Sequence, residues 1–300
     1  MNRWLTYQKE RFPLLAHGPL IAAFSACAVS YSSLLRGSPI PSPWMFLTAF
    51  IVCLLMFLQL RIADEFKDAE EDAKWRPYRA VPRGLVSLKE LRIVFIVAAL
   101  VQAGLVLLLD PRLILILAIA WSYLALMSVE FFARDWLKNR PVIYLVSHMG
   151  IMPLVDFFAT SCEWLPRGAT APTGLGWFLA ASFFNGIVIE LGRKLRQPAD
   201  EEEGVETYSR LWGKGRASIV WLIALAATLA SAAFAAHAIQ FSTPVLIVLS
   251  IFFLVAAFEA YRYRTTLRPG KKIEYISALW TLSLYLMLGL IPLVLHHTRS

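Results

Sequence analysis

Six acidic residues lie between positions 64 and 72, at the end of a long apolar run. On a helix that turns about 100° per residue, five of them would share an arc of about 120°. They are Asp64, Glu65, Asp68, Glu71 and Asp72. Like charges at this spacing repel one another, and the repulsion grows where water is scarce. We therefore expect a cation on this face. Carboxylate oxygens suit Mg²⁺, which often binds phosphate groups at the same time.

Basic residues follow this first acidic segment directly and supply the complementary charge. They are Lys74, Arg76, Arg79 and Arg83. Arginine guanidinium groups bind phosphate oxygens through two parallel hydrogen bonds. Carboxylates for a metal ion beside guanidinium groups for phosphate form the combination that a diphosphate site needs. A solvated, charged helix end would explain the basic residues, but it would not explain five acids on one face.

Long apolar runs surround these polar residues and must position them. The chain of 300 residues is 58% hydrophobic and only 17% charged, with a mean hydropathy of +0.59. A soluble domain of this length does not normally carry so little charge. A helix needs about 20 apolar residues to cross about 30 Å of hydrocarbon. Nine membrane-spanning helices are predicted, over residues 16–35, 44–63, 88–109, 112–132, 141–161, 174–192, 217–238, 243–262 and 273–295.

The basic residues also predict how the chain is oriented in the lipid bilayer. Of the 29 lysines and arginines, most fall in the N-terminal segment or in loops on the same side. The exceptions are Arg36, Arg112, Arg167 and Arg299. Because positive loops stay in the cytoplasm, the N-terminus is expected inside and the C-terminus outside a bacterial-type inner membrane. These flanking charges account for much of the +8 net charge without a nucleic acid partner.

The first acidic segment resembles the first aspartate-rich motif of the UbiA family of intramembrane prenyltransferases. That motif reads Asn-Asp-x-x-Asp-x-x-x-Asp and is followed by Arg-Pro-x-Arg-Pro-x-x-x-Gly-x-x-Ser. Asp68 and Asp72 match its last two aspartates, Glu65 stands at the first, and Asp64 replaces the asparagine. The match continues through Arg76, Pro77, Arg79, Gly84 and Ser87, whereas residues 80–82 depart from the pattern.

The spans, the inside N-terminus and the loop spacing also look like that family, so the resemblance covers essentially the whole chain. It implies an all-α, polytopic membrane protein with a nine-helix bundle and one membrane domain over residues 1–300. A cytoplasmic-side polar cap is expected from residues of about 64–87 and of about 193–216.

The resemblance implies a Mg²⁺-dependent enzyme that ionises a polyprenyl diphosphate and transfers the prenyl group to an unidentified acceptor. It places the first metal ion on Asp64, Glu65, Asp68 and Asp72. It places the diphosphate on Lys74, Arg76, Arg79, Arg193 and Lys194. Stabilisation of the charge that develops on the leaving diphosphate would be the main catalytic effect.

Members of the family carry a second aspartate-rich motif after the sixth span, and here the pattern departs. In this second acidic segment, Glu190 stands where an aspartate is expected and Lys194 occupies the position four residues on. The resemblance makes Glu190 and Asp200 ligands of a second metal ion, while Lys194 would hold the diphosphate directly. Alternatively, Glu190 and Lys194 form an ordinary helical ion pair and Asp200 only favours a helix start after Pro198.

Polar residues inside the apolar runs form a further set of candidates. Tyr144, His148 and Asp156 lie in the fifth span, where an ionisable group is a functional hypothesis by default. A bond to a neighbouring helix would explain them equally well. Four residues near the cytoplasmic loop that precedes this span could contact an acceptor, although they also fit an ordinary charged loop: Glu130, Arg134, Asp135 and Asn139. The three cysteines follow no metal or disulfide spacing, so redox chemistry gets no support.

Two other functions compete with the transferase. A UbiA-type terpene cyclase would use the same ionisation, but the substrate's own double bonds would capture the cation. A transporter would show two-fold internal repeats, and the chain repeats only its two acidic segments. Release of diphosphate would exclude the transporter, and a hydrocarbon product without an acceptor would identify the cyclase. The acceptor and the length of the prenyl chain are not readable from the sequence.

Overall fold

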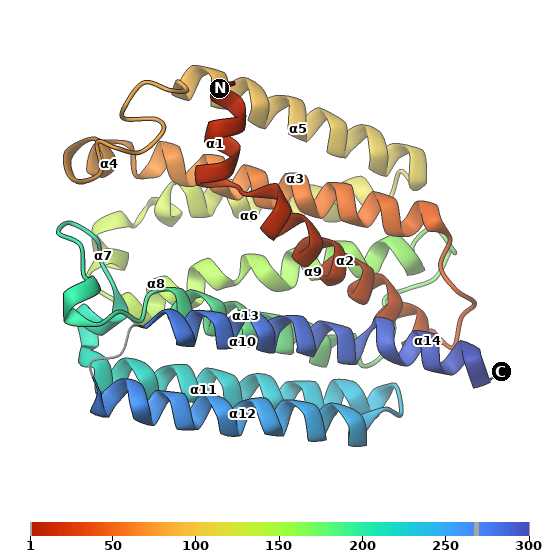
Figure 1. Ribbon diagram of the computed structural model, residues 1–300. Coiled ribbons are helices and arrows are strands. Elements are labelled where there is room, and N and C mark those ends of the chain that lie inside the picture. Colours follow the sequence, from red (N-terminus) through yellow and green to blue (C-terminus); the bar gives the residue numbers. More distant parts are fainter. Residues whose placement is uncertain (1, 267–269, 300) are drawn as a thin grey trace.

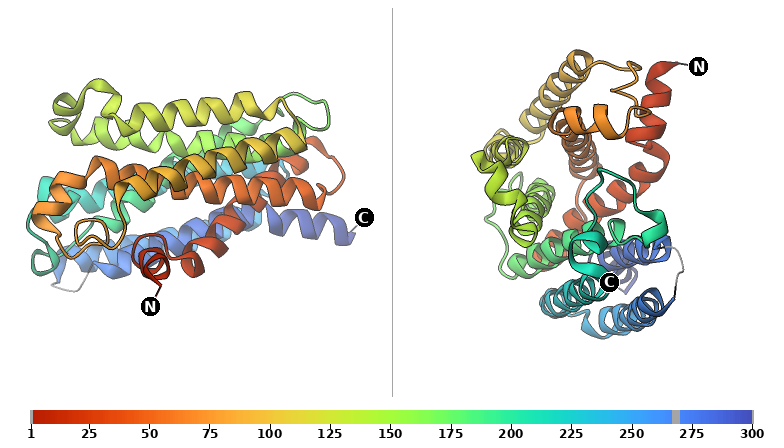
Figure 2. Two further views of the ribbon diagram at one scale, coloured as in Figure 1. Left: turned by 90° about the horizontal axis from the view of Figure 1, so that it is seen from above. Right: turned by 90° about the vertical axis from the view of Figure 1, so that its left-hand side faces the viewer.

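The structure is a computed structural model that describes residues 2–266 and 270–299, and all regular elements in these ranges are helical. Long helices run side by side along one direction (Figure 1). They are α2 (Leu14–Arg36), α3 (Pro43–Lys67), α5 (Leu88–Leu109), α6 (Leu113–Ser128), α9 (Ile151–Trp164), α10 (Leu175–Arg193), α11 (Tyr208–Ala238), α12 (Ser242–Thr265) and α13 (Lys271–Leu288). The end view in Figure 2 shows these helices arranged around a central region.

Short helices complete the chain at both ends of the bundle. They are α1 (Arg3–Arg11), α4 (Ala69–Trp75), η1 (Glu130–Phe132), α7 (Arg134–Lys138), α8 (Pro141–Met149), η2 (Pro198–Asp200) and α14 (Leu290–Arg299). Most of them gather at the end of the bundle where α3 and α10 finish, on the left of Figure 1. This end of the bundle contains both acidic segments, and we call it the cap.

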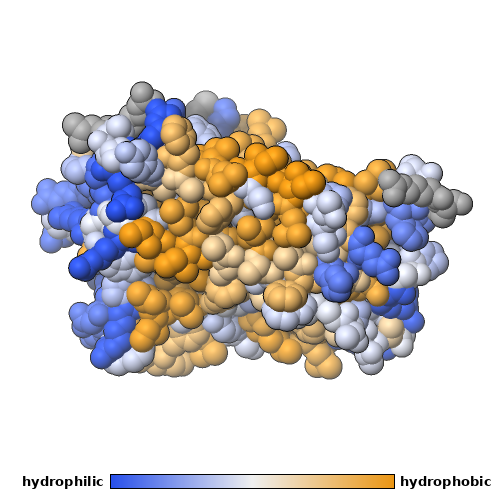
Figure 3. Space-filling view, turned by 90° about the horizontal axis from the view of Figure 1, so that it is seen from below, coloured by the Kyte–Doolittle hydropathy of each residue, from blue (hydrophilic) through white to orange (hydrophobic). Residues whose placement is uncertain are grey.

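The outer surface confirms an integral, multi-pass membrane protein. Among the described residues, eight helices are long and apolar enough to cross a bilayer. A broad hydrophobic surface lies between two hydrophilic ends in Figure 3, as expected for a protein whose middle faces lipid. The predicted all-α membrane fold is therefore confirmed. The remaining predicted span, over residues 112–132, corresponds to α6, which has only 16 residues.

Several predicted boundaries differ from the structure for local backbone reasons. The span predicted over 112–132 ends at Ser128, because residues 130–132 adopt a left-handed conformation with φ of 52°, 52° and 58°. The span predicted over 141–161 is divided at Gly150 into α8 and α9. The last span is divided at Gly289, where a Cβ atom would lie 2.4 Å from Cα of Cys27.

Capping and one buried ion cluster fix the helix ends. Ser87 and Glu90 form the reciprocal capping box at the start of α5 that their spacing suggests. At the end of the bundle away from the cap, the fully buried Glu163 accepts hydrogen bonds from Ser32 (2.8 Å) and Arg36 (3.0 Å). These bonds tie α9 to α2. The chemistry that the sequence predicts is concentrated at the opposite end.

Candidate functional site

Asp72 is the most firmly held acid of the first segment. It is buried in α4, 2.8 Å from Nε of Arg76 and 2.8 Å from Nη1 of Arg79. Because both guanidinium groups bind the same carboxylate, Asp72 orders the loop that leads from α4 towards α5. The two arginines that the sequence assigns to a diphosphate are thus already paired with an acid of the same segment.

Asp68 differs, because its side chain forms neither a hydrogen bond nor a close ion pair with any residue that the structure describes. It ends α3, and the α4 backbone begins directly after it. Burial raises the pKa of the Asp68 carboxyl above its usual range. The neighbouring Asp64, Asp72 and Glu71 raise it further, and Lys67 opposes them. A partly buried carboxylate crowded by other carboxylates is where a cation is needed.

Asp64 and Glu65 contact different basic residues. Asp64 lies 3.6 Å from Arg61, and it is also close enough to Arg193 of α10 for the two charges to interact. Glu65 is buried and is bound by Arg11 of α1. The sequence did not indicate that α1 reaches the first acidic segment, and the structure therefore does not leave Glu65 free to bind a metal ion.

The second acidic segment is neutralised by its own basic residues. Glu190, at the end of α10, lies 2.6 Å from Nη2 of Arg193 and 2.9 Å from Nζ of Lys194. Asp200 is exposed on η2, at the outside of the cap. Thus the structure does not bring Glu190 and Asp200 together as a pair of metal ligands. It presents Arg193 and Lys194 as cations, with Arg193 facing Asp64 across the cap.

The remaining basic residue assigned to the diphosphate points elsewhere. Lys74 is exposed and stacks over the ring of Trp75 at 4.6 Å. Trp75 in turn lies against Gly204, where a Cβ atom would be 2.2 Å from the indole ring. Because Gly204 also has a φ of +72°, only glycine fits there without strain. This contact joins the loops that carry the two acidic segments.

The first acidic segment suits one divalent cation better than a two-metal site. Within the described ranges, no three His, Cys, Asp or Glu side chains are grouped so that they could hold a metal ion without further ligands. Mg²⁺ does not need such a cage, because it keeps several waters and often binds through one or two carboxylates plus phosphate oxygens. Asp64 and Asp68 lie one turn apart on α3 and supply that donor set. Glu190 does not fit a metal ion, since basic groups already hold both of its oxygens.

A buried polar network adjoins Asp68 on the other side of the cap. Lys67 donates a hydrogen bond to the Tyr144 hydroxyl at 2.8 Å, and that hydroxyl donates to Glu130 at 3.2 Å. His148 lies 3.2 Å from the second oxygen of Glu130. The sequence singled out Glu130, Tyr144 and His148 separately. Their connection through Lys67 was missed, because it depends on how α3 and α8 pack.

The other candidates from the sequence belong neither to the metal and diphosphate residues nor to the network around Glu130. Asp156 is buried deep in the bundle and accepts a 2.8 Å hydrogen bond from Tyr285. Arg134 lies 3.9 Å from Glu71, whose closer partner is Lys138 at 2.8 Å. The Asn139 side chain donates to the backbone oxygen of Asp135 within the same short turn. These contacts are explained by helix packing and by the surface of the cap.

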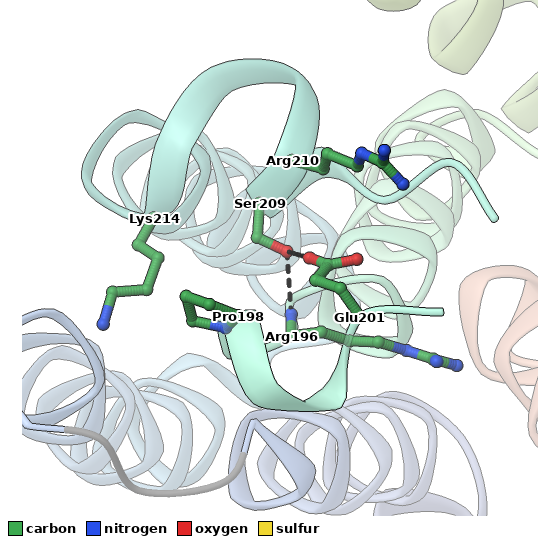
Figure 4. A pocket seen from close by; sticks show the side chains of 6 residues that line it. All are labelled: Arg196, Pro198, Glu201, Ser209, Arg210 and Lys214. Carbon is green, nitrogen blue, oxygen red and sulfur yellow. Dashed lines mark hydrogen bonds between the residues drawn. The ribbon is translucent and has the colours of Figure 1, made fainter. Parts of the chain in front are cut away.

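Two cavities open on the cap. One, of about 230 Å³, lies in the second loop, where Ser209 bonds both Glu201 and the backbone of Arg196 (Figure 4). A larger one, of about 410 Å³, lies between α1 and the two cap loops. Its residues are Glu10, Arg11, Tyr78, Arg79, Arg83, Arg196, Glu202 and Val205. Arg83 pairs with Glu10 at 2.7 Å and Arg196 with Glu202 at 3.2 Å. The larger cavity is therefore polar and largely neutralised, whereas three basic residues and a single acid line the smaller one.

Among the described residues, the fold and the cap define an all-helical membrane protein with acidic and basic side chains gathered at one end of its bundle. The chain belongs to the UbiA prenyltransferase family, whose sequence model matches residues 22–283. A search of curated proteins found no match.

Solved structures share the same fold at low sequence identity. A UbiA homologue from Aeropyrum pernix K1, in its apo form, has a TM-score of 0.68 at 12% identity, and the match covers 92% of this chain and 98% of that one. A digeranylgeranylglyceryl phosphate synthase matches over 100% of both chains, with a TM-score of 0.62 and 14% identity. A UbiA homologue from Archaeoglobus fulgidus bound to DMAPP and Mg²⁺ has a TM-score of 0.59 at 13% identity, covering 93% and 99%.

Proposed function

We propose that this protein is a Mg²⁺-dependent intramembrane prenyltransferase that ionises a polyprenyl diphosphate and transfers the prenyl group to an acceptor. One observation carries the proposal. In a chain of this family, Asp68 has no close ion-pair partner among the described residues and three neighbouring acids outnumber Lys67, while Arg193 and Lys194 at the end of α10 share the single acid Glu190. A cation beside Asp68 and an anion beside Arg193 and Lys194 would balance both groups of charges. The DMAPP and Mg²⁺ bound to the Archaeoglobus homologue support this pairing.

The chain's own residues would share the work as follows. Asp64 and Asp68 hold the metal ion, which supplies positive charge to the leaving diphosphate oxygens. Arg193 and Lys194 bind the same diphosphate from the α10 side, and Glu190 positions them. Asp72 acts indirectly, because it holds the loop with Arg76 and Arg79. Developing charge is stabilised by groups already in place, which lowers the barrier without reorganisation of the site.

The membrane helices bring the prenyl chain to this end of the bundle. A polyprenyl tail partitions into hydrocarbon, so the substrate would enter from the bilayer with its diphosphate at the cap. We further propose that the cap faces the cytoplasm, with the N-terminus inside and the C-terminus outside. The exclusion of most lysines and arginines from the opposite side supports this orientation.

The direct test is release of diphosphate by the purified protein. Geranyl, farnesyl, geranylgeranyl and longer prenyl diphosphates would be supplied with Mg²⁺ or EDTA. Each would be combined with phenols, phenolic acids, naphthoic acids, tetrapyrroles, sugar phosphates or glycerol phosphate, and also supplied with no acceptor. Products would be identified by mass. The proposal predicts metal-dependent release accompanied by a prenylated acceptor.

The other outcomes are equally decisive. No release with any donor and acceptor would contradict the proposal. Release without an acceptor, accompanied by a cyclised terpene, would replace the transferase with a terpene cyclase. Release that continues in EDTA would reject the role given to Asp68.

A further inference from the structure

Glu130 is held in its buried position by an unusual backbone. Glu130, Phe131 and Phe132 all have positive φ, with values of 52°, 52° and 58°. Left-handed conformations are unfavourable for every residue other than glycine. Such strain persists only where the surrounding structure imposes it, and it is concentrated at functional sites. The turn places the Glu130 carboxylate inside the cap, with 4% of the residue exposed.

His148 lies beside the Glu130 carboxylate and is held in place by its own helix. Its Nδ1 lies 2.9 Å from the backbone oxygen of Tyr144 and 3.4 Å from Oγ of Ser147, and its Nε2 lies 3.2 Å from Oε2 of Glu130. These contacts fix the position of the ring, so His148 limits where the Glu130 carboxylate can lie.

The groups around this pair fix its geometry. Tyr144 stacks on the His148 ring at 3.9 Å, and Phe131 meets the same ring edge-on at 5.9 Å. The Tyr123 hydroxyl donates to the Ser147 backbone oxygen at 2.5 Å, an approach that Gly150 permits because a Cβ atom there would clash. The side of α8 that carries His148 is therefore tightly packed.

The charged neighbours come from each element that packs here. Lys67 of α3 lies 3.4 Å from Glu130 and bonds the Tyr144 hydroxyl. Tyr208 of α11 is close enough to Tyr144 for the two groups to interact electrostatically. Burial disfavours the ionised form of Glu130, but His148, Lys67 and Tyr144 outweigh burial and hold its pKa below the usual range. The carboxylate is thus available as a base beside the first acidic segment.

We propose that Glu130 is the terminal proton acceptor of the transfer reaction, reached through the Tyr144 hydroxyl and positioned by His148. The proposal rests on the proposed function. The diphosphate leaves with the C1–O electron pair, and the acceptor's nucleophilic atom gives an electron pair to C1. The bond from that atom to hydrogen then breaks, and its electrons stay on the acceptor. The Tyr144 hydroxyl takes the proton while passing its own to Oε1 of Glu130.

A phenolic, alcoholic or activated aromatic acceptor bearing an exchangeable or ring proton fits this arrangement. Once prenylated, each of these groups is a strong acid, so even a carboxylate with a lowered pKa can deprotonate it. An acceptor that has no proton to lose after prenylation would not need Glu130 as a base. This step therefore concerns proton removal, and ionisation of the donor belongs to Asp68 and Lys194.

The first test needs no substrate. The chain has only 5 histidines, so ¹⁵N spectra of the histidine-labelled protein in detergent can resolve the His148 ring, which is assigned from its loss in His148→Gln. Because the His148 ring lies against the Glu130 carboxylate, its ¹⁵N resonances should move in Glu130→Gln and stay in place in the exposed variant Glu203→Gln. His148 resonances that do not change in Glu130→Gln would remove the contact that positions Glu130 and contradict the proposal.

The second test uses whichever donor and acceptor give a product in the assay above. Glu130→Gln keeps a hydrogen-bond acceptor for Tyr144 but cannot take a proton, so product formation should fall about 100-fold. Product formation by Tyr144→Phe should fall by a similar factor, whereas product formation by the exposed control Glu203→Gln should not change. Diphosphate affinity should stay near the wild-type value in all three. Wild-type turnover by Glu130→Gln would overturn the inference, while no product from the wild-type protein would instead reject the proposed function.

Discussion

The two acidic segments of the cap carry similar residues, but they differ in how far their own basic side chains neutralise their acids. In the first, Asp68 has no close ion-pair partner within the described ranges, and the repulsion from three neighbouring acids is opposed by Lys67 alone. In the second, Arg193 and Lys194 both bind Glu190. The first segment therefore calls for an external cation, whereas the second already contains its own. Acid content alone does not make a metal site, since the arrangement of the nearest basic groups decides what an acidic segment can bind.

The largest expected effect comes from Asp68→Asn. Removing the carboxylate that would bind the metal ion should lower turnover by about 1,000-fold, as for the loss of a main electrostatic stabiliser. Because the removed charge is crowded by other acids, thermal stability should be unchanged or slightly higher. Turnover and melting temperature of the purified variant check both points. Near-wild-type turnover would remove the first segment from the site.

Asp72→Asn should combine lost activity with lost stability. This carboxylate binds Arg76 and Arg79, and breaking a buried ion pair by removing one partner costs about 3 kcal/mol. Turnover should also fall severely, because the loop beside Asp68 loses its anchor. Denaturant unfolding of the two variants, measured side by side, should separate them. Equal stability of Asp68→Asn and Asp72→Asn would contradict the different roles assigned here.

Lys194→Met tests the opposite side of the cap. Glu190 would keep Arg193 as a partner at 2.6 Å, so the fold should persist. One charge-assisted hydrogen bond to the diphosphate would be lost, which corresponds to roughly a 10-fold weaker affinity. Binding of inorganic diphosphate, measured by calorimetry, gives the affinity directly. Lys138→Met is the matched control, because Lys138 pairs with Glu71 at the edge of the cap; equal losses in both variants would argue against a specific role for Lys194.

The pH dependence of stability should also distinguish Asp68 from ordinary acids. The folded protein binds the Asp68 proton more tightly than the unfolded chain, since the pKa is raised on folding. Ionising Asp68 at neutral pH therefore costs stability, and the cost disappears as pH falls below the unfolded value of about 3.9. In EDTA, Asp68→Asn should exceed the wild-type stability at neutral pH, and the difference should shrink on acidification. A difference that grows in acid would reverse the sign and refute this account.

Hydropathy was sufficient to predict the bundle, because each span must cover a bilayer with apolar residues. The capping box at Ser87 was also readable, since it depends on residues three positions apart. The contact between Arg11 and Glu65 was not, because α1 is short and charged and its place depends on tertiary packing. The left-handed turn at Glu130 was missed for a similar reason, since no residue in it is glycine.

For the site, the sequence predicted which charged residues gather at one end of the bundle, but not how they pair. The sequence placed Asp68, Glu190 and Lys194 at one end of the bundle, and the structure agrees. It offered the ion pair between Glu190 and Lys194 as an alternative to a second metal site, and the structure contains that pair. It gave no sign that Asp68 would lack a comparable partner in the part of the chain that the structure describes. That difference depends on which basic side chain reaches which acid.

The smallest effect is expected for Glu71→Gln. Glu71 shares the first segment, but its side chain is 43% exposed and pairs with Lys138 at 2.8 Å. Surface pairs of this kind contribute about 0.5 kcal/mol. Its turnover and Mn²⁺ affinity should match the wild type. A large loss in either would extend the metal site to the outer face of α4.

The central claim is that the cap binds one divalent cation at the first segment and none at the second. Electron paramagnetic resonance titration of the purified protein with Mn²⁺, in the presence of inorganic diphosphate, counts the bound ions. The account predicts one ion, lost in Asp68→Asn and retained in Glu190→Gln. Two bound ions in the wild-type protein, one of them lost in Glu190→Gln, would contradict it.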